Sequence, residues 1–189
     1  MNITVAPCDL PEKSIIILIG MMGAGKTTVG RALAKKLGRK FVDLDHAIVE
    51  RCGVDIPTIF DIEGEEGFRR REKEALLDVI LDRDIVLATG GGAILRADNR
   101  ELMKQHGQIF YLRVEIDELY RRVARDKNRP LLATPNPKLR LSELLAERSA
   151  IYEAAADYII DSAGDSQTVV VEQIINLLAE REDKWVLFE

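Results

Sequence analysis

The stretch with the clearest chemical meaning is residues 20–27, "GMMGAGKT", which fits the pattern G-x-x-x-x-G-K-[ST] in full. Glycines let backbone N–H groups converge on phosphate oxygens, and the N-terminus of a following helix adds its positive end. Lys26 can reach the β- and γ-phosphates, and the Thr27 hydroxyl can ligate Mg²⁺. The alternative is a glycine-rich turn that contains Lys-Thr by chance. The pattern predicts binding of ATP with Mg²⁺ by Gly23, Ala24, Gly25, Lys26, Thr27 and Thr28.

Two carboxylates, Asp43 and Asp45, stand two positions apart at the end of the apolar run 40–45, "KFVDLD". If this run is a strand, its period of two puts both side chains on one side, at the edge where open α/β sheets bind ligands. One could hold Mg²⁺ through water, and the other could accept a hydrogen bond from a hydroxyl. Two alternatives stay open: caps of the next helix, or a D-x-D phosphatase nucleophile.

Two further segments could complete a site for a second ligand. In "EGFRRRE" (66–72), Arg69 and Glu72 are three apart and share a face if the segment is helical. Of three consecutive arginines, at most two can face one site, where a guanidinium fork suits a carboxylate or phosphate. In "GGG" (90–92), backbone without side chains permits close approach of a ligand. The alternatives are solvated surface arginines and a tight strand-to-helix turn.

The elements that must position these residues alternate along the chain. Short apolar runs bounded by turn residues predict strands at 14–20, 40–45, 84–90, 108–114 and 157–161. A helical pattern follows the P-loop (20–30) and is predicted to end at Gly38, its C-cap. Further helical patterns occur at 65–82, 98–106, 116–126, 141–155 and 168–182. This alternation predicts an α/β fold of three layers, α/β/α, with a five-stranded parallel sheet flanked by helices.

One segment breaks the alternation. Residues 125–141, "RDKNRPLLATPNPKLRL", hold three prolines and many charges with little periodicity. A loop this long in a compact domain is often a mobile lid, and a tolerated surface insertion is the alternative. Without repeats or low-complexity tracts, the chain is predicted to be a single kinase domain over 1–189, with an acceptor-binding region at 43–72.

Composition limits the partners. The 189-residue chain has a net charge of −5, which argues against a general nucleic-acid or membrane-surface binder. An acidic ligand therefore needs a local basic cluster. Cys8 and Cys52 have no metal-ligand spacing and are expected to be reduced thiols. No signal peptide or membrane-length apolar stretch is recognised, so a cytoplasmic monomer acting on small molecules is expected.

The class of nucleotide-binding protein can be narrowed. The chain has no N-K-x-D guanine motif, and the "DIEG" at 61–64 does not follow a predicted strand, which argues against a GTPase. Motor-type ATPases are longer and place an acidic residue after a later strand, where "IVLATGGG" ends in glycines. A short chain with a lid favours a small-molecule kinase, because closure keeps water from the γ-phosphate.

Taken together, the motifs resemble those of the shikimate kinases, P-loop kinases of aromatic amino-acid biosynthesis with a fold like that of nucleoside-monophosphate kinases. The resemblance runs from about residue 14 to residue 180. Its markers stand in order: "GMMGAGKTTVGRALA", "FVDLD", "FDIEGEEGFRRRE", "ATGGGA", "NRPLL" and "ERSAIY". The resemblance implies transfer of the ATP γ-phosphate to shikimate, which gives shikimate 3-phosphate and ADP.

The resemblance also implies roles for matching residues. Asp43 would assist Mg²⁺ binding beside Thr27, and Asp45 would bind the shikimate hydroxyls and accept the proton of the attacking one. Arg69 and Arg148 would bind the shikimate carboxylate. Gly91 and Gly92 would add backbone contacts to shikimate.

Three further roles follow from the same resemblance. Arg129 would swing from the lid onto the phosphates, so that Lys26, Asp45 and Arg129 are the catalytic residues. Arg122 would pack against adenine, and Glu72 would hold the arginines in place. One departure is Ala150, where the family often shows proline.

Three rival interpretations remain. A gluconate kinase would share the P-loop but would need no pair of arginines for a carboxylate. A nucleoside monophosphate kinase is disfavoured because no "DG-x-P-R"-type segment appears. A non-catalytic ATP-binding module is disfavoured because a retired enzyme need not keep Lys26, Thr27, Asp43, Asp45 and Arg129.

Overall fold

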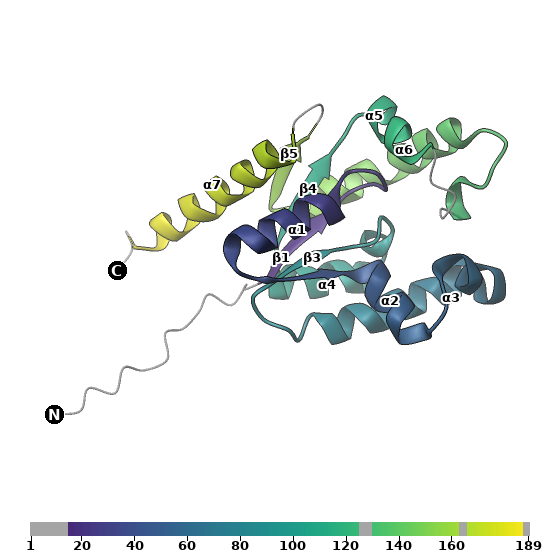
Figure 1. Ribbon diagram of the computed structural model, residues 1–189, viewed down its shortest axis with the longest axis horizontal. Helices are drawn as coiled ribbons and strands as arrows, with labels where there is room; N and C mark the ends of the chain where they lie inside the picture. The colour runs from purple at the N-terminus through teal and green to yellow at the C-terminus, as the bar shows by residue number, and fades with distance from the viewer. Residues whose placement is uncertain (1–14, 125–129, 163–165, 187–189) are drawn as a thin grey trace.

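The sheet has five strands in the order β2-β3-β1-β4-β5, and every pair of neighbours is parallel (Figure 1). The computed structural model describes residues 15–124, 130–162 and 166–186, without the side chains of 181–186. The strands are β1 (Ile15–Ile19), β2 (Lys40–Asp43), β3 (Ile85–Ala88), β4 (Gly107–Arg113) and β5 (Tyr158–Asp161). The prediction of a five-stranded parallel sheet is confirmed.

Helices cover both faces of this sheet, which confirms the three-layer prediction (Figure 1). They are α1 (Lys26–Leu37), α2 (Leu44–Cys52), α3 (Ile56–Val79), α4 (Ala97–His106), α5 (Ile116–Val123), α6 (Pro137–Ala155) and α7 (Gln167–Val186). Helices α1 and α7 pack against each other, whereas α4 and α6 both contact β4 and α3 contacts α4. Two short 3-10 turns, η1 (Ala93–Leu95) and η2 (Pro130–Leu132), complete the connections.

The core is built around the central strand. All five residues of β1 are buried, because β3 and β4 flank it and helices cover both of its faces. This explains why β1 reads as an unbroken apolar run rather than an alternating one. Helix α1 ends at Gly38, whose φ of 67° is the left-handed C-cap that the sequence predicts. The central position of β1 places the P-loop at the middle of the carboxyl edge.

The helices of the acceptor-binding region differ from the prediction in two ways. Residues 44–52 form a helix, α2, that the sequence analysis does not include, and α3 begins at Ile56 rather than at 65. Helix α3 is interrupted at Gly64, whose φ of 69° and ψ of −175° are not helical. This kink divides the apolar pattern into two short pieces, so the first piece does not stand out as a helix.

The segment predicted to be an irregular lid, 125–141, is helical over its C-terminal residues. Helix α6 starts at Pro137 rather than 141, because proline suits a first helical turn and the Asn136 side chain accepts a hydrogen bond from the backbone N–H of Leu139. Residues 130–132 form η2. Residues 125–129 lie outside the described part of the chain, so the mobile lid stays a prediction.

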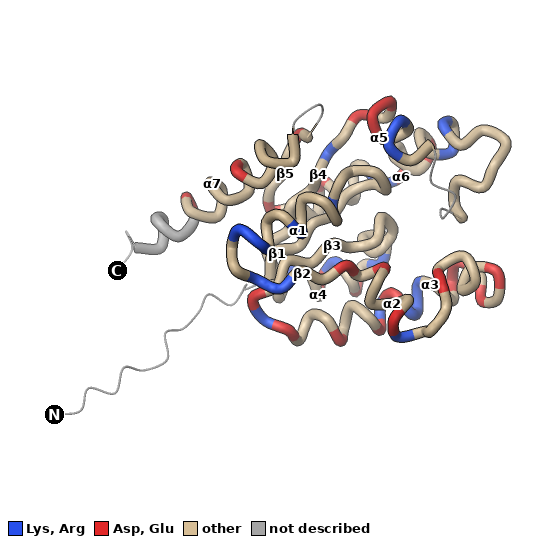
Figure 2. Tube along the Cα trace, in the orientation of Figure 1, with Lys and Arg blue, Asp and Glu red and all other residues tan. Residues whose placement is uncertain are grey.

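Charges of both signs are distributed over the helices and loops, and Lys and Arg do not gather on one side of the described chain (Figure 2). Within the described ranges, no helix is both long and apolar enough to cross a membrane.

Candidate active site

The P-loop joins the end of β1 to the start of α1. Three of its glycines have positive φ angles, 143° at Gly20, 82° at Gly23 and 93° at Gly25. A Cβ on Gly20 would lie 2.7 Å from the carbonyl oxygen of Leu112, so this position also requires the smallest residue. The loop therefore turns sharply enough to bring its backbone N–H groups to the N-terminus of α1, as an anion site requires.

Lys26 is held across this loop. Its side chain is buried, and its amino group donates hydrogen bonds to the carbonyl oxygens of Gly20, at 2.8 Å, and Met21, at 2.9 Å. The cation is thus kept beside the loop amides rather than extended into solvent. The same geometry means that phosphate oxygens would compete with two carbonyls for the amino group.

Asp43 and Asp45 do not share a strand, which corrects the period-two argument. Strand β2 ends at Asp43, and Asp45 lies in the first turn of α2. Asp43 caps this helix, since its Oδ1 accepts from the backbone N–H of Asp45 and His46, at 3.1 and 3.4 Å. Its Oδ2 accepts from the Thr27 hydroxyl at 2.7 Å. The capping alternative is correct for Asp43, and the same carboxylate also reaches the P-loop.

A cavity opens over the P-loop. Its lining contains both carboxylates and two residues that follow β3: Met22, Gly23, Gly25, Lys26, Thr27, Thr28, Asp43, Asp45, Thr89, Gly91 and Arg122. Ala24 is buried and does not line it, but borders a neighbouring hollow with Gly25, Thr28, Val29, Arg122, Ser162, Gln167 and Val170. The two hollows are adjacent along α1, a length that suits the phosphates and base of one nucleotide.

Arg122 stands between these two hollows and lines both. Its Nη1 donates to the carbonyl oxygen of Gly23 at 3.2 Å, and its Nε donates to Glu118 at 2.7 Å. Arg122 is therefore tied to the P-loop from α5, a contact between residues that are far apart in the sequence.

A second cavity lies beside the first, and Asp45, Met22 and Gly91 line both. The rest of its wall contains Ile56, Phe60, Phe68, Arg69, Glu72, Gly90, Gly92, Pro130, Leu131 and Arg148. All five residues that the resemblance assigns to shikimate meet here: Asp45, Arg69, Gly91, Gly92 and Arg148. The wall combines two guanidinium groups with apolar side chains, so it suits a small organic anion.

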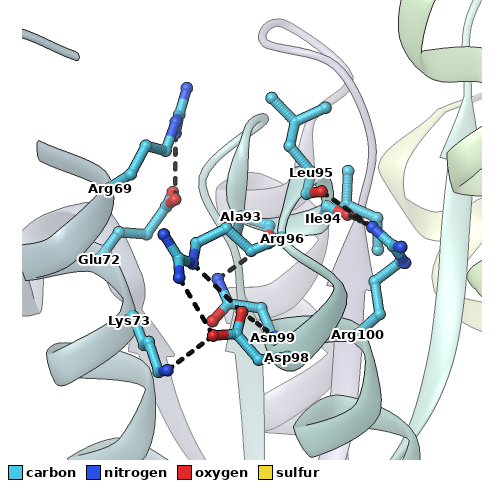
Figure 3. A network of polar contacts seen from close by, with 10 residues as sticks. All are labelled: Arg69, Glu72, Lys73, Ala93, Ile94, Leu95, Arg96, Asp98, Asn99 and Arg100. Atoms are coloured by element: carbon cyan, nitrogen blue, oxygen red, sulfur yellow. Dashed lines mark hydrogen bonds and ion pairs between the residues drawn. The ribbon is translucent and has the colours of Figure 1, made fainter. Parts of the chain in front are cut away.

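Arg69 is fixed on both sides by carboxylates. Its Nη1 donates to Glu72 Oε2 at 3.0 Å (Figure 3), and its Nη2 donates to Glu65 Oε1 at 2.9 Å. The prediction that Arg69 and Glu72 share a helix face is confirmed. Of the three consecutive arginines, only Arg69 lines the cavity, because Arg70 is exposed and Arg71 pairs with Glu63.

Burial controls the protonation of this cluster. The Glu72 side chain is fully buried, and burial raises its pKa to about 7, against the opposing effect of the Arg69 charge. For Arg69, burial lowers the pKa, but Glu72 and Glu65 outweigh it and the pKa is raised. The guanidinium therefore stays charged while Glu72 titrates near neutrality.

The glycines after β3 bring backbone close to this cluster. The Gly91 carbonyl oxygen accepts hydrogen bonds from Arg148 Nη1, at 3.3 Å, and from the Tyr152 hydroxyl. A Cβ on Gly90 would lie 2.7 Å from Asp45 Oδ1, and one on Gly92 would overlap the Arg69 guanidinium. Side-chain-free backbone is thus needed for the protein's own polar groups. Arg148 Nε is buried and has no hydrogen-bond partner among the described residues.

Some lining residues escape the sequence analysis. Thr89, whose hydroxyl donates to the Leu18 carbonyl oxygen at 3.2 Å, could have been found as the first polar residue after a buried strand. The apolar wall has no comparable signal, because Ile56, Phe60 and Phe68 follow the same helical spacing as core residues. Arg129 lies outside the described residues.

Fold and cavities together define a class. A P-loop on the central strand of a parallel α/β sheet, beside a second cavity with two arginines, is the architecture of a protein that binds a nucleoside triphosphate next to an anionic second ligand.

Comparison with known proteins gives the family. The shikimate kinase family model matches residues 22–179. A shikimate kinase of Bordetella avium is 50% identical over 178 residues, which is 94% of this chain and 83% of that protein. The solved structure of shikimate kinase from Acinetobacter baumannii in complex with shikimate is 45% identical with a TM-score of 0.87, covering 89% of this chain and 94% of that one. The chain belongs to the shikimate kinase family.

A more distant match shows the fold alone. A gluconokinase from Sinorhizobium meliloti 1021 has a TM-score of 0.58 at 15% identity, covering 94% of this chain and 98% of that one.

Proposed function

We propose that this protein transfers the γ-phosphate of ATP to the 3-hydroxyl of shikimate, giving shikimate 3-phosphate and ADP. The observation that carries the proposal is that Asp45 lines both the P-loop cavity and the arginine-bearing cavity. A shikimate hydroxyl bound at Asp45 would therefore face the γ-phosphate of ATP in the neighbouring cavity, as phosphoryl transfer requires. Family membership supports the same reaction.

The nucleotide half of the site is contiguous. Gly23, Ala24, Gly25, Lys26, Thr27 and Thr28 are proposed to hold the phosphates, through the backbone N–H groups of the loop and the Lys26 ammonium. Lys26 exchanges its hydrogen bonds to two loop carbonyls for bonds to phosphate oxygens. Arg122 is proposed to pack against the adenine, since it lines the hollow next to the P-loop cavity.

The donor set beside the loop fits Mg²⁺. A hydroxyl and a carboxylate oxygen, from Thr27 and Asp43, lie 2.7 Å apart at the phosphate site. Within the described ranges, no group of three or more acidic, His or Cys residues could cage a metal. That suits Mg²⁺, which keeps waters and takes further oxygens from the substrate phosphates. When bound, Mg²⁺ neutralises charge on the phosphates; Asp43 would hold it through water.

The acceptor half is assembled from distant residues. Arg69 and Arg148 are proposed to bind the shikimate carboxylate, with backbone contacts from Gly91 and Gly92. Arg148 lines the acceptor cavity, which supports contact of its guanidinium with a carboxylate bound there. Asp45 is proposed to orient the reacting hydroxyl and to accept its proton.

The mechanism needs positioning and charge neutralisation rather than a covalent intermediate. Lys26 stabilises charge on the transferring group, while Asp45 aligns the hydroxyl. Arg129 is proposed to add a further cation from the lid. The monomeric state and the cytoplasmic location stay predictions.

The test is an ADP-release assay with Mg-ATP, offering shikimate, gluconate and nucleoside monophosphates in parallel. Turnover on shikimate alone is expected. Arg69→Ala should raise the KM for shikimate by about 10- to 100-fold, because it removes charge-assisted hydrogen bonds worth about 1.5–3 kcal/mol. Arg70→Ala is the matched control, since Arg70 is the neighbouring exposed arginine.

A second variant isolates the chemical step. Asp45→Asn should lower kcat by about 10²- to 10⁴-fold, the usual contribution of a general base, with little change in the KM for ATP. Turnover on another acceptor would mean that the arginine-bearing cavity is misassigned. ATP binding without turnover on any acceptor would support a non-catalytic module instead.

A further inference from the structure

Beneath the acceptor cavity lies a polar cluster that none of the roles above uses. Asp98, in the first turn of α4, accepts hydrogen bonds from Lys73 and Arg96 (Figure 3). We call these three residues the Asp98 clamp. They connect α3, which carries Arg69 and Glu72, to the segment that follows Gly92.

On the α3 side, the connection is a single ion pair. Lys73 Nζ donates to Asp98 Oδ2 at 2.6 Å, and Lys73 is the residue directly after the buried Glu72. A shift of α3 at Lys73 relative to α4 therefore also shifts Glu72. It would move the Arg69 guanidinium as well, because Arg69 Nη1 donates to Glu72 at 3.0 Å.

On the η1 side, Asp98 belongs to a hydrogen-bonded junction between the start of α4 and η1. Arg96 Nε and Nη2 each donate to the Asp98 carboxylate at 3.2 Å. The Asn99 amide donates to the carbonyl oxygen of Ala93 at 3.0 Å, and Arg100 Nη1 donates to those of Ile94 and Leu95 (Figure 3). The first turn of α4 thus fixes every carbonyl of η1, which begins directly after Gly92.

The distance between α3 and η1 affects the acceptor site where Arg69 meets Gly92. A Cβ on Gly92 would overlap the Arg69 guanidinium, so the guanidinium packs directly on the Gly92 backbone. The gap available to a carboxylate at Arg69 depends on how closely α3 approaches η1, and these two elements are in contact.

We propose that Asp98 is a positioning residue of the acceptor site: through Lys73 and Arg96 it sets the spacing between Arg69 and the Gly92 backbone, and thereby the affinity for the acceptor carboxylate. The clamp residues are about 37–39% exposed in their side chains, so the pairs themselves add little to stability. Their effect is on geometry, at a site where small displacements cost binding.

The proposal rests on the proposed function, because it assigns a role in binding shikimate. The test compares wild type, Asp98→Asn and Lys73→Met by steady-state kinetics and by calorimetric titration with shikimate. Each variant should raise the KM and the Kd for shikimate about 3- to 10-fold, with the KM for ATP within about twofold of wild type. The double variant should show less than the product of the two single effects, since both remove one interaction. Lys73→Arg, which keeps a cation in reach of Asp98, should restore the wild-type KM.

The matched control is Asp82→Asn. Asp82 accepts from Lys40 at 2.8 Å, another Lys–Asp pair, but at the start of β2 and so at the opposite edge of the sheet. This variant should leave both KM values unchanged.

Two results would overturn the proposal. The first is an unchanged KM and Kd for shikimate in Asp98→Asn and Lys73→Met. The second is an equal rise in the KM for ATP together with a fall in the melting temperature, which would show a merely structural role. Failure of the proposed function would be seen separately, as absence of shikimate turnover by the wild-type protein.

Discussion

Single residues decide how near the parts of the acceptor site can come to each other. The sequence predicts that Gly90–Gly92 admit a ligand to the backbone, and the structure shows that they first admit the protein's own side chains. Asp45 and Glu72 pack on Gly90, and Arg69 packs on Gly92. The run of three glycines can be recognised in the sequence. The side chains that pack on it cannot, because they come from α2 and α3, which are distant in the sequence.

Gly92→Ala tests this packing. The backbone at Gly92, with φ of −110° and ψ of −6°, suits an L-residue, so the change adds bulk without backbone strain. The new Cβ overlaps the Arg69 guanidinium, which has to shift although Glu72 and Glu65 hold it. We expect the KM for shikimate to rise by about tenfold or more, as for a misplaced binding group, and the melting temperature to fall because the buried Arg69–Glu72 pair is disturbed. Kinetics and calorimetry check this, and an unaltered KM would show that Arg69 need not lie on Gly92.

At the scale of elements, contiguity decides what can be predicted. The P-loop, the strand before it and the helix after it are adjacent in sequence, so spacing and periodicity locate them together. The acceptor region is harder to predict because its helices are short pieces. Helix α2 follows its capping residue Asp43 directly, so its first residues resemble the end of a strand.

The same limit applies to the acceptor wall. Arginines and glycines are conspicuous in sequence, and resemblance to a family assigned them. Ile56, Phe60 and Phe68 are not conspicuous, because an apolar residue that lines a cavity and one that fills a core obey the same helical period.

The kink at Gly64 gives an element-scale prediction. Its φ of 69° and ψ of −175° lie in a region that is essentially restricted to glycine. No atom lies within 4 Å of a Cβ built there, so any cost of Gly64→Ala is conformational. We expect a loss of about 3 kcal/mol in the free energy of unfolding.

Gly53→Ala is the control for this change. Gly53 is equally open, but its φ of 69° and ψ of 7° are left-handed helical, which an alanine adopts at a cost of about 1–2 kcal/mol. Urea denaturation of both variants measures the difference, and equal losses would contradict the assignment of the kink to Gly64.

At the scale of the whole molecule, an acidic protein binds acidic ligands through local charge. The net charge is −5, yet the two adjacent cavities contain Lys26, Arg69, Arg122 and Arg148. Composition predicts that such a cluster must exist. Only the fold determines that the arginines come from α3, α5 and α6 and meet at one edge of the sheet.

Buried Glu72 links the stability of the fold to pH. Burial raises its pKa from 4.5 to about 7, so the folded protein holds this proton more tightly than the unfolded chain. The resulting stabilisation is complete below pH 4.5 and is lost as the pH rises to about 7. Glutamine does not titrate, so Glu72→Gln does not lose stability in this way as the pH rises. Between pH 4.5 and 7, the free energy of unfolding of the variant should therefore increase by about 3 kcal/mol relative to that of wild type.

Urea denaturation of both proteins at several pH values measures this difference. A difference that stays constant from pH 4.5 to 7 would show that Glu72 is ionised throughout. Because only the difference is used, carboxylates that titrate identically in both proteins cancel.

The acceptor cavity also has a consequence for how the chain matures. Its wall takes residues from Met22 to Arg148, including parts of α2, α3 and α6, whereas the loop that cradles phosphate spans only a few consecutive positions. The wall can form only after these distant segments have docked on one another. Capture of shikimate during refolding therefore reports the docking of α2, α3 and α6, but not that of β5 and α7, which do not line the cavity.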